Sequence, residues 1–107
     1  MQLQIGKQVF TVRSCKTTLE QGRGLLFTSP KKIQGAFFFL PFPKRVALHS
    51  LFLVHTLTLV YIDADSRVLS TGRLSPFTLF YLTPRTTHLI ELFGNHSFKK
   101  REKIIMR

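Results

Sequence analysis

The sequence is poor in two kinds of residue, cysteine and acidic side chains. Cys15 is the single cysteine among 107 residues, which excludes an intramolecular disulfide and a cysteine-rich metal site. The chain contains five Asp and Glu residues and sixteen Lys and Arg residues, so its formal charge at neutral pH is +11. Such an excess favours attraction to nucleic acid or anionic surfaces, and it equally suits a chain whose eleven phenylalanines need solubilising.

Segments that would carry the chain into or across a membrane are not apparent either. Residues 1–7 lack the basic start and the apolar core of about 7 to 15 residues that mark a signal peptide. The longest charge-free run, residues 46–62, is shorter than the stretch of about 20 apolar residues that a spanning helix needs. The run also contains several His, Ser and Thr residues. We therefore predict a cytoplasmic protein without a transmembrane helix.

The charge-free run is instead predicted to form the core of the fold as two consecutive strands. It is rich in β-branched and aromatic residues, and apolar side chains occupy both parities of the strand. Both faces of such a strand must be covered, as they are in a sandwich or a barrel. His49 and Asp63 should lie near the two ends of this element. The side chains expected to be buried are Leu51, Phe52, Leu57, Leu59 and Val60.

The remaining segments predict a small β domain with one helix. Further short strands are predicted at residues 8–14, 35–40, 67–71, 77–82, 87–93 and 103–106. Thr17 and Glu20 have the spacing of a capping box, so a short helix is predicted to begin at Thr17. A chain of 107 residues fits one domain. The predicted fold is mostly β: a single small antiparallel β-sandwich or barrel-like domain with one short N-terminal helix.

Few residues suggest chemistry. Asp63 and Asp65 stand two apart in a predicted hairpin turn, where Asp far more often forms the turn than a catalytic pair. His49, His55 and His88 would bind a metal only if three ligands converged, and His49 and His55 lie about 20 Å apart along an extended strand. We retain His49, Asp63 and Asp65 as a candidate ligand or turn site. No catalytic residue, cofactor or metal is predicted.

Basic residues are unevenly distributed along the chain. Residues 1–48 carry eight basic side chains and one acidic one, residues 49–98 carry three of each, and residues 99–107 carry five basic and one acidic. The candidate polyanion patch consists of Lys31, Lys32, Lys44, Arg45, Lys99, Lys100, Arg101 and Lys103. It predicts weak, salt-sensitive association with nucleic acid or an anionic surface.

Five short motifs occur in an order that resembles a known family. They are Thr17-x-x-Glu20-x-x-Arg23-Gly24-Leu25, His49-Ser50-Leu51-Phe52-Leu53, Tyr61-Ile62-Asp63-x-Asp65-x-Arg67-Val68, Leu74-x-Pro76, and Leu89-Ile90-Glu91-Leu92 with Gly94. Over residues 9–106 the chain resembles the family catalogued as domain of unknown function 192. The resemblance implies a mostly antiparallel β domain with a short N-terminal helix and no established biochemical function.

The chain departs from that family's pattern at several polar positions. Thr56 and Thr58 stand where the family usually has Pro and then Asp, and Gln21 stands where it favours Arg. If the family's polar residues form a binding site, this chain retains part of it. The sequence therefore predicts an uncharacterised, non-enzymatic binding or interaction module of undefined ligand. The alternative is a basic protein that binds RNA or DNA through its Lys/Arg patch.

Overall fold

The protein, seen in a computed structural model, is built from β-strands throughout the described residues, which are 1–15, 33–45, 47–48, 55–78 and 81–106. The strands are β1 (Gln2–Ile5), β2 (Gln8–Cys15), β3 (Gly35–Lys44), β4 (Ala47–Leu48), β5 (Leu57–Ile62), β6 (Val68–Leu74), β7 (Tyr81–Leu82), β8 (Thr86–Phe93) and β9 (Ile104–Met106). These ranges contain no helix. The helix predicted from Thr17, and the predictions made for His49, Leu51 and Phe52, fall outside them.

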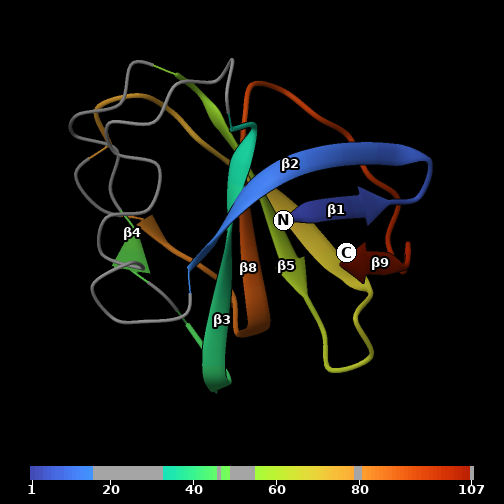
Figure 1. The fold of residues 1–107 in the computed structure, drawn as a ribbon. Helices are drawn as coiled ribbons and strands as arrows, with labels where there is room; N and C mark the ends of the chain where they lie inside the picture. Colours follow the sequence, from blue (N-terminus) through green and yellow to red (C-terminus); the bar gives the residue numbers. More distant parts are fainter. Residues whose placement is uncertain (16–32, 46, 49–54, 79–80, 107) are drawn as a thin grey trace.

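Seven strands form one mixed sheet that curls into a half-barrel, in the order β6-β5-β8-β3-β2-β1-β9 (Figure 1). β4 and β7 form a separate two-stranded sheet. β2 and β3 pair in parallel, whereas the other neighbours in the large sheet are antiparallel, which corrects the purely antiparallel prediction. A parallel pair needs a crossover of about a dozen residues or more, and residues 16–34 provide the length.

Strand β5, which lies between β6 and β8, shows why the sheet must be covered on both faces. All six of its residues are buried, as the apolar run predicted. Leu57, Leu59 and Tyr61 belong to one core cluster, and Val60 and Ile62 belong to another. Successive side chains of a strand point to opposite faces, so each face of the sheet has its own core. The predicted burial of Leu57, Leu59 and Val60 is confirmed.

The two cores differ in what encloses them. The concave core lies inside the curl and draws on strands from both ends of the sheet; it contains Leu3, Ile5, Phe10, Val12, Phe37, Val60, Ile62, Val68, Ile90, Leu92 and Ile104. The convex core contains Ala36, Phe38, Leu57, Leu59, Tyr61, Leu74, Leu89 and Phe93. Leu48 of β4 and Tyr81 of β7 pack on the convex core, where the Tyr61 and Tyr81 hydroxyl oxygens lie 2.9 Å apart.

The two edges of the half-barrel are tied together at one end. The amide of Val68, where β6 begins, donates to the carbonyl of Glu102 over 2.9 Å, and the amide of Arg101 donates back to the carbonyl of Val68 over 2.7 Å. The amide of Ile104 in β9 donates to the carbonyl of Ser66 over 2.9 Å. These bonds hold the hairpin between β5 and β6 beside the segment that leads into β9.

Several predicted boundaries need correction. Of residues 77–82, only Tyr81–Leu82 are assigned to a strand among the residues described, and Phe77 lies in a turn with φ 61°. Thr78 closes that turn by donating its hydroxyl to the carbonyl of Ser75 over 2.7 Å. Strand β1 was not predicted, because its alternation is only four residues long.

Candidate functional site

The hairpin turn between β5 and β6 is built around the carboxylate of Asp63. Its Oδ1 accepts hydrogen bonds from the amides of Asp65 (2.9 Å) and Arg67 (3.0 Å). The backbone closes the same turn, because the Asp63 amide donates to the Arg67 carbonyl over 3.0 Å. This is the turn-forming role predicted for Asp63, and it leaves part of the carboxylate's hydrogen-bonding capacity committed to the backbone.

A second turn, from Lys99 to Glu102, faces the hairpin. The Glu102 carboxylate accepts from the amide of Lys99 over 2.6 Å, and the Glu102 amide donates to the Lys99 carbonyl over 3.3 Å. The Arg67 side chain crosses between the turns, since its Nη1 donates to the carbonyl of Arg101 over 3.0 Å. An isolated bridge between Arg67 and Lys103 extends the contact.

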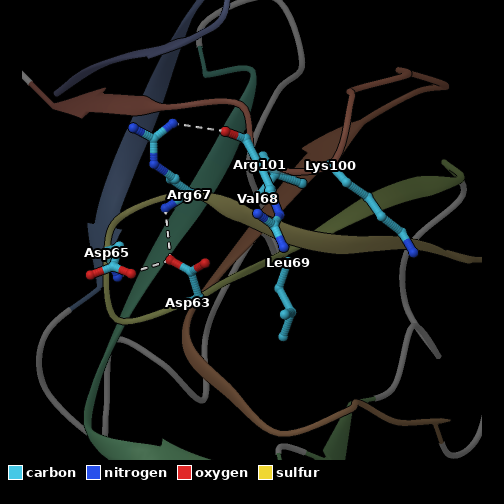
Figure 2. Close-up of a pocket in the computed structure, with 7 residues that line it drawn as sticks. All are labelled: Asp63, Asp65, Arg67, Val68, Leu69, Lys100 and Arg101. Carbon is cyan, nitrogen blue, oxygen red and sulfur yellow. Dashed lines mark hydrogen bonds between the residues drawn. The ribbon is translucent and has the colours of Figure 1, made fainter.

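A hollow of about 690 Å³ lies where these two turns meet, and Figure 2 shows its walls. Its lining residues are Asp63, Asp65, Arg67, Val68, Leu69, Lys100 and Arg101. Figure 2 shows Arg67 reaching the Arg101 carbonyl, while the Lys100 side chain extends away from the other labelled groups. The hollow therefore combines three cationic side chains with two carboxylates and a small apolar surface.

The acids at this end are tied to backbone amides, whereas the cations are not paired with them. Asp63 and Glu102 both accept from turn amides. Within the described ranges, neither acid forms a salt bridge with the cationic groups of Arg67, Lys100 or Arg101. Charge-assisted bonds to amides satisfy a carboxylate without neutralising a neighbouring cation. The cationic groups thus remain available to an anion.

Backbone strain is concentrated at the same place. Three described residues other than glycine have positive φ: Ser66 at 59°, Phe77 at 61° and Arg101 at 68°. Ser66 lies in the first turn and Arg101 in the second, so two of the three flank the hollow. A left-handed conformation costs a residue with a side chain about 1 to 2 kcal/mol. Such strain is often retained at functional sites.

The predicted polyanion patch is brought together only in part. Lys99, Lys100, Arg101 and Lys103 are exposed residues of one segment, and two of them line the hollow. Arg45 is also exposed, but it follows β3, and β8 and β5 stand between β3 and β6 in the sheet. Lys44 ends β3 opposite Thr86. Lys31 and Lys32 fall outside the described residues, as does His49 of the candidate ligand site.

Arg67 is the one hollow cation that the sequence analysis did not select. A cation following Asp-x-Asp-x in a hairpin turn gave no signal of its own, because its role depends on a contact with Arg101, 34 residues further on. Leu69 was missed for a similar reason. It stands at a register shift between β5 and β6, which leaves it 43 % exposed beside the hollow.

Glu91 is a second residue whose position the sequence analysis left unexplained. It lies on β8 within the convex core and is 6 % exposed. Burial raises the pKa of its carboxyl to about 7. A single acid inside the apolar segment Leu89–Phe93 was the available signal, because a charge at a core-facing strand position is rare.

His88 lies on the opposite face of β8 from Glu91. Its ring contacts those of Phe37 and Phe39, and burial lowers its pKa. Within the described ranges, no three His, Cys, Asp or Glu side chains are placed to hold a metal ion. The same ranges contain no helix with the length and apolar character required to cross a membrane.

Comparison with known proteins gives one distant relative in sequence and close likeness in fold. The chain is 24% identical over 82 residues to UPF0127 protein PH1112 of Pyrococcus horikoshii, covering 75% of this chain and 70% of that protein. A crystal structure of a protein of unknown function from Novosphingobium aromaticivorans superposes with a TM-score of 0.85 at 19% identity, covering 99% of this chain and 84% of that one. A crystal structure of a protein from Sinorhizobium meliloti, which is named as a putative transcription regulator, superposes with a TM-score of 0.79 at 14% identity. The match covers 97% of this chain and 89% of that one.

These findings correct the family assignment made from the short motifs. No family model matches this chain, so membership of domain of unknown function 192 is not supported. The sequence similarity found is the distant one to the UPF0127 protein, and it brings no activity with it. At 19% and 14% identity, the structural likenesses establish the fold alone.

Proposed function

We propose that this protein is a non-enzymatic binding module that holds an anionic ligand in the hollow between its two turns. One observation carries the proposal. Three cationic residues, Arg67, Lys100 and Arg101, line a hollow in which the Oδ1 of Asp63 accepts hydrogen bonds from the amides of its own turn. The volume of about 690 Å³ falls within the range of about 300 to 1,000 Å³ common for small-ligand sites.

The chemistry favours a compact anion such as a phosphate or a carboxylate. Arg101 and Lys100 offer several N–H donors from adjacent positions, and Arg67 is held in place by the Arg101 carbonyl. Asp65 also lines the hollow, and its charge disfavours an anion on that side. The ligand is therefore expected to sit toward the turn formed by Lys99 to Glu102.

A polyanion is the second candidate, and a separate observation favours it. The exposed Lys99 and Lys103 flank the hollow on the same segment, so a chain of phosphates could follow that segment beyond the hollow. Single-stranded nucleic acid usually also needs aromatic faces on which its bases stack. None of the described residues that line the hollow is aromatic, so we rank a nucleic acid below a compact anion.

The first experiment removes one charge without damaging the turn. In Arg101→Gly the new residue adopts φ 68° without the side-chain penalty, so the fold should be retained while one donor group is lost. Ser66→Gly is the matched control, because it relieves the same kind of strain and removes no charge. Pyrophosphate titrated at low salt should bind the wild type and Ser66→Gly equally, and Arg101→Gly at least about tenfold more weakly. Equal affinity in all three proteins would contradict the proposal.

The second experiment separates the two candidate ligands. Arg45→Gln removes an exposed cation that lies across the sheet from the hollow. For a compact anion, this change should leave pyrophosphate affinity unaltered. A single-stranded oligonucleotide bound along the whole basic patch would instead lose about 0.7 from its log–log salt slope with each phosphate contact removed. If Arg45→Gln lowers that slope, and pyrophosphate does not compete with the oligonucleotide for binding, a polyanion replaces the compact anion as the proposed ligand.

A further inference from the structure

The hollow between the two turns carries charges of both signs, and a simple anion would use only one of them. Asp63 and Asp65 line it from the hairpin between β5 and β6. Lys100 and Arg101 line it from the second turn, and Arg67 adds a third cation. Three cations and two carboxylates leave the lining with a net charge of +1. A ligand that matches the whole lining therefore needs a positive group as well as a negative one.

The acidic side of the hollow keeps oxygen atoms for a ligand. Oδ1 of Asp63 accepts from the amides of Asp65 and Arg67, whereas Oδ2 accepts no hydrogen bond from the described part of the chain. Asp65 is an exposed residue, and only its backbone amide takes part in the turn. A carboxylate can accept about four hydrogen bonds, so both acids can receive donors from a ligand in the hollow.

The two signs of charge are separated across the hollow. Figure 2 shows Asp65 and Lys100 on opposite sides of the labelled group, with Asp63 between them. The Leu69 side chain also lies between the acids and Lys100 in that view, and it is 43 % exposed. An exposed apolar side chain between an acidic and a basic side is complementary to an alkyl chain that joins a cation to an anion.

We propose that the ligand of the hollow is a phosphate monoester that carries a primary ammonium group on a short alkyl chain. This inference rests on the anion-binding function proposed above and names the class of anion. The phosphate accepts hydrogen bonds from Lys100 and Arg101. The ammonium group donates to Oδ2 of Asp63 and to the Asp65 carboxylate, and the alkyl chain packs on Leu69.

Charge balance favours a monoester over a diester. A phosphate monoester carries a charge of about −1.5 to −2 at neutral pH. One ammonium group brings the net charge of the ligand to about −1, which is opposite to the +1 of the lining. A diester of the same amine, such as the head group of an amino lipid, has no net charge and offers the three cations a single negative charge. The diester should therefore bind more weakly.

The first test compares ligands on the wild-type protein by calorimetry at low salt. Aminoalkyl phosphates with chains of two, three and four carbons are each compared with the alkyl phosphate of the same length. At least one amino ester should bind about threefold or more tightly than its alkyl counterpart, the gain expected of exposed ion pairs. If the alkyl phosphates bind and no amino ester binds better, this inference is overturned while the anion-binding function stands. If neither they nor pyrophosphate bind, the anion-binding function itself fails. Glycerophosphoethanolamine is the diester control, and affinity equal to that of aminoethyl phosphate would overturn the monoester assignment.

The second test is Asp65→Asn, which removes one carboxylate and keeps the backbone amide that donates to Asp63. The variant should bind the preferred amino ester about threefold more weakly, because one partner of the ammonium group is lost. It should bind the matching alkyl phosphate up to about threefold more tightly, because a like charge is removed. Shifts of opposite sign cannot come from general damage to the turn. Affinities that both stay unchanged, or that move in the same direction in a folded variant, would overturn the inference. If the variant does not fold, the wild-type comparison of amino and alkyl esters decides the matter.

Discussion

At the scale of single residues, β8 carries two titratable groups, the buried Glu91 and the half-buried His88, whose effects on stability oppose each other. Burial raises the pKa of Glu91 on the convex face and lowers the pKa of His88 on the concave face. The folded protein therefore binds the Glu91 proton more tightly than the unfolded chain does, and binds the His88 proton less tightly. Stability should fall on the acid side because of His88 and on the alkaline side because of Glu91.

The Glu91 contribution can be tested by itself. Its pKa rises from 4.5 to about 7, so its protonated form favours folding, and this stability is lost as the pH rises through that interval. The full loss corresponds to about 3 kcal/mol. Glu91→Gln should accordingly be more stable than the wild type by about 1 to 3 kcal/mol at pH 8, with a smaller difference at pH 5. Urea unfolding at both pH values measures this, and a wild type more stable than the variant at pH 8 would refute it.

Ser66 gives a residue-scale prediction that concerns the backbone. Its φ of 59° suits glycine, and relief of a left-handed strain of about 1 to 2 kcal/mol exceeds the entropic cost of about 0.5 to 1 kcal/mol that glycine brings. Ser66→Gly should raise the free energy of unfolding by up to about 1 kcal/mol. Chemical denaturation at fixed pH would show it. Ser70→Gly, on the adjoining strand β6, is the contrast and should destabilise.

At the scale of elements, Thr86 joins β8 to β5 through one buried hydroxyl. The Ile62 amide donates to its Oγ1 over 2.8 Å, and the hydroxyl lies within hydrogen-bond distance of the Ile62 and His88 carbonyls. Thr86 is 2 % exposed, so water cannot replace these contacts easily. The hydroxyl thus satisfies the end of the β5 ladder where the hairpin turn begins.

Replacing Thr86 with valine should therefore be costly despite the similar shape. The change leaves the buried Ile62 amide without its acceptor, which costs about 1 to 3 kcal/mol. Thr71→Val, at an exposed position on β6, is the matched control and should change stability by less than about 0.5 kcal/mol. The two free energies of unfolding in urea give the comparison, and equal values would show that the Thr86 hydroxyl contributes nothing.

The elements that could be predicted from sequence are those whose pattern is local. The charge-free apolar run that contains residues 57–62 and the short segment 87–93 predicted β5 and β8, and Asp63 to Ser66 predicted the turn of the β5–β6 hairpin. The parallel pairing of β2 with β3 had no local signal, because it joins segments separated by a long crossover. Three residues of the hollow, Asp63, Lys100 and Arg101, were selected from the sequence as candidate site residues. That they lie together was not predicted, because the two turns meet only when the whole sheet curls.

At the scale of the whole molecule, the excess of positive charge must act against the compact state. A net charge of +11 on a folded chain of 107 residues produces self-repulsion, which dissolved salt screens. The exposed basic residues of the segment from Lys99 to Lys103 are close together in sequence and contribute to it. A polyanion-binding surface and a solubilising surface would both show this repulsion.

Raising NaCl from about 20 to 300 mM should therefore increase the thermal midpoint, since the Debye length falls from about 20 Å to below 10 Å. Sodium sulfate at equal ionic strength tells screening from site binding. Screening alone predicts similar midpoints for the two salts, whereas an anion site in the hollow predicts a larger rise with the divalent anion. A midpoint that falls with NaCl would show that attractive pairs outweigh the repulsion.

The pairing of β1 with β9 also bears on how the protein is made. Leu3 pairs with Met106, and the segment before β9 ties back to the start of β6, so residues from both ends of this chain complete the same sheet (Figure 1). During synthesis β1 leaves the ribosome before β9 and gains its second neighbour only after residues 104–106 have emerged. Until then, β1 keeps an unpaired edge, and Leu3 and Ile5 lack the cover that Ile104 will provide. The nascent chain should therefore be most prone to aggregation through the β1 edge in the interval before β9 is released.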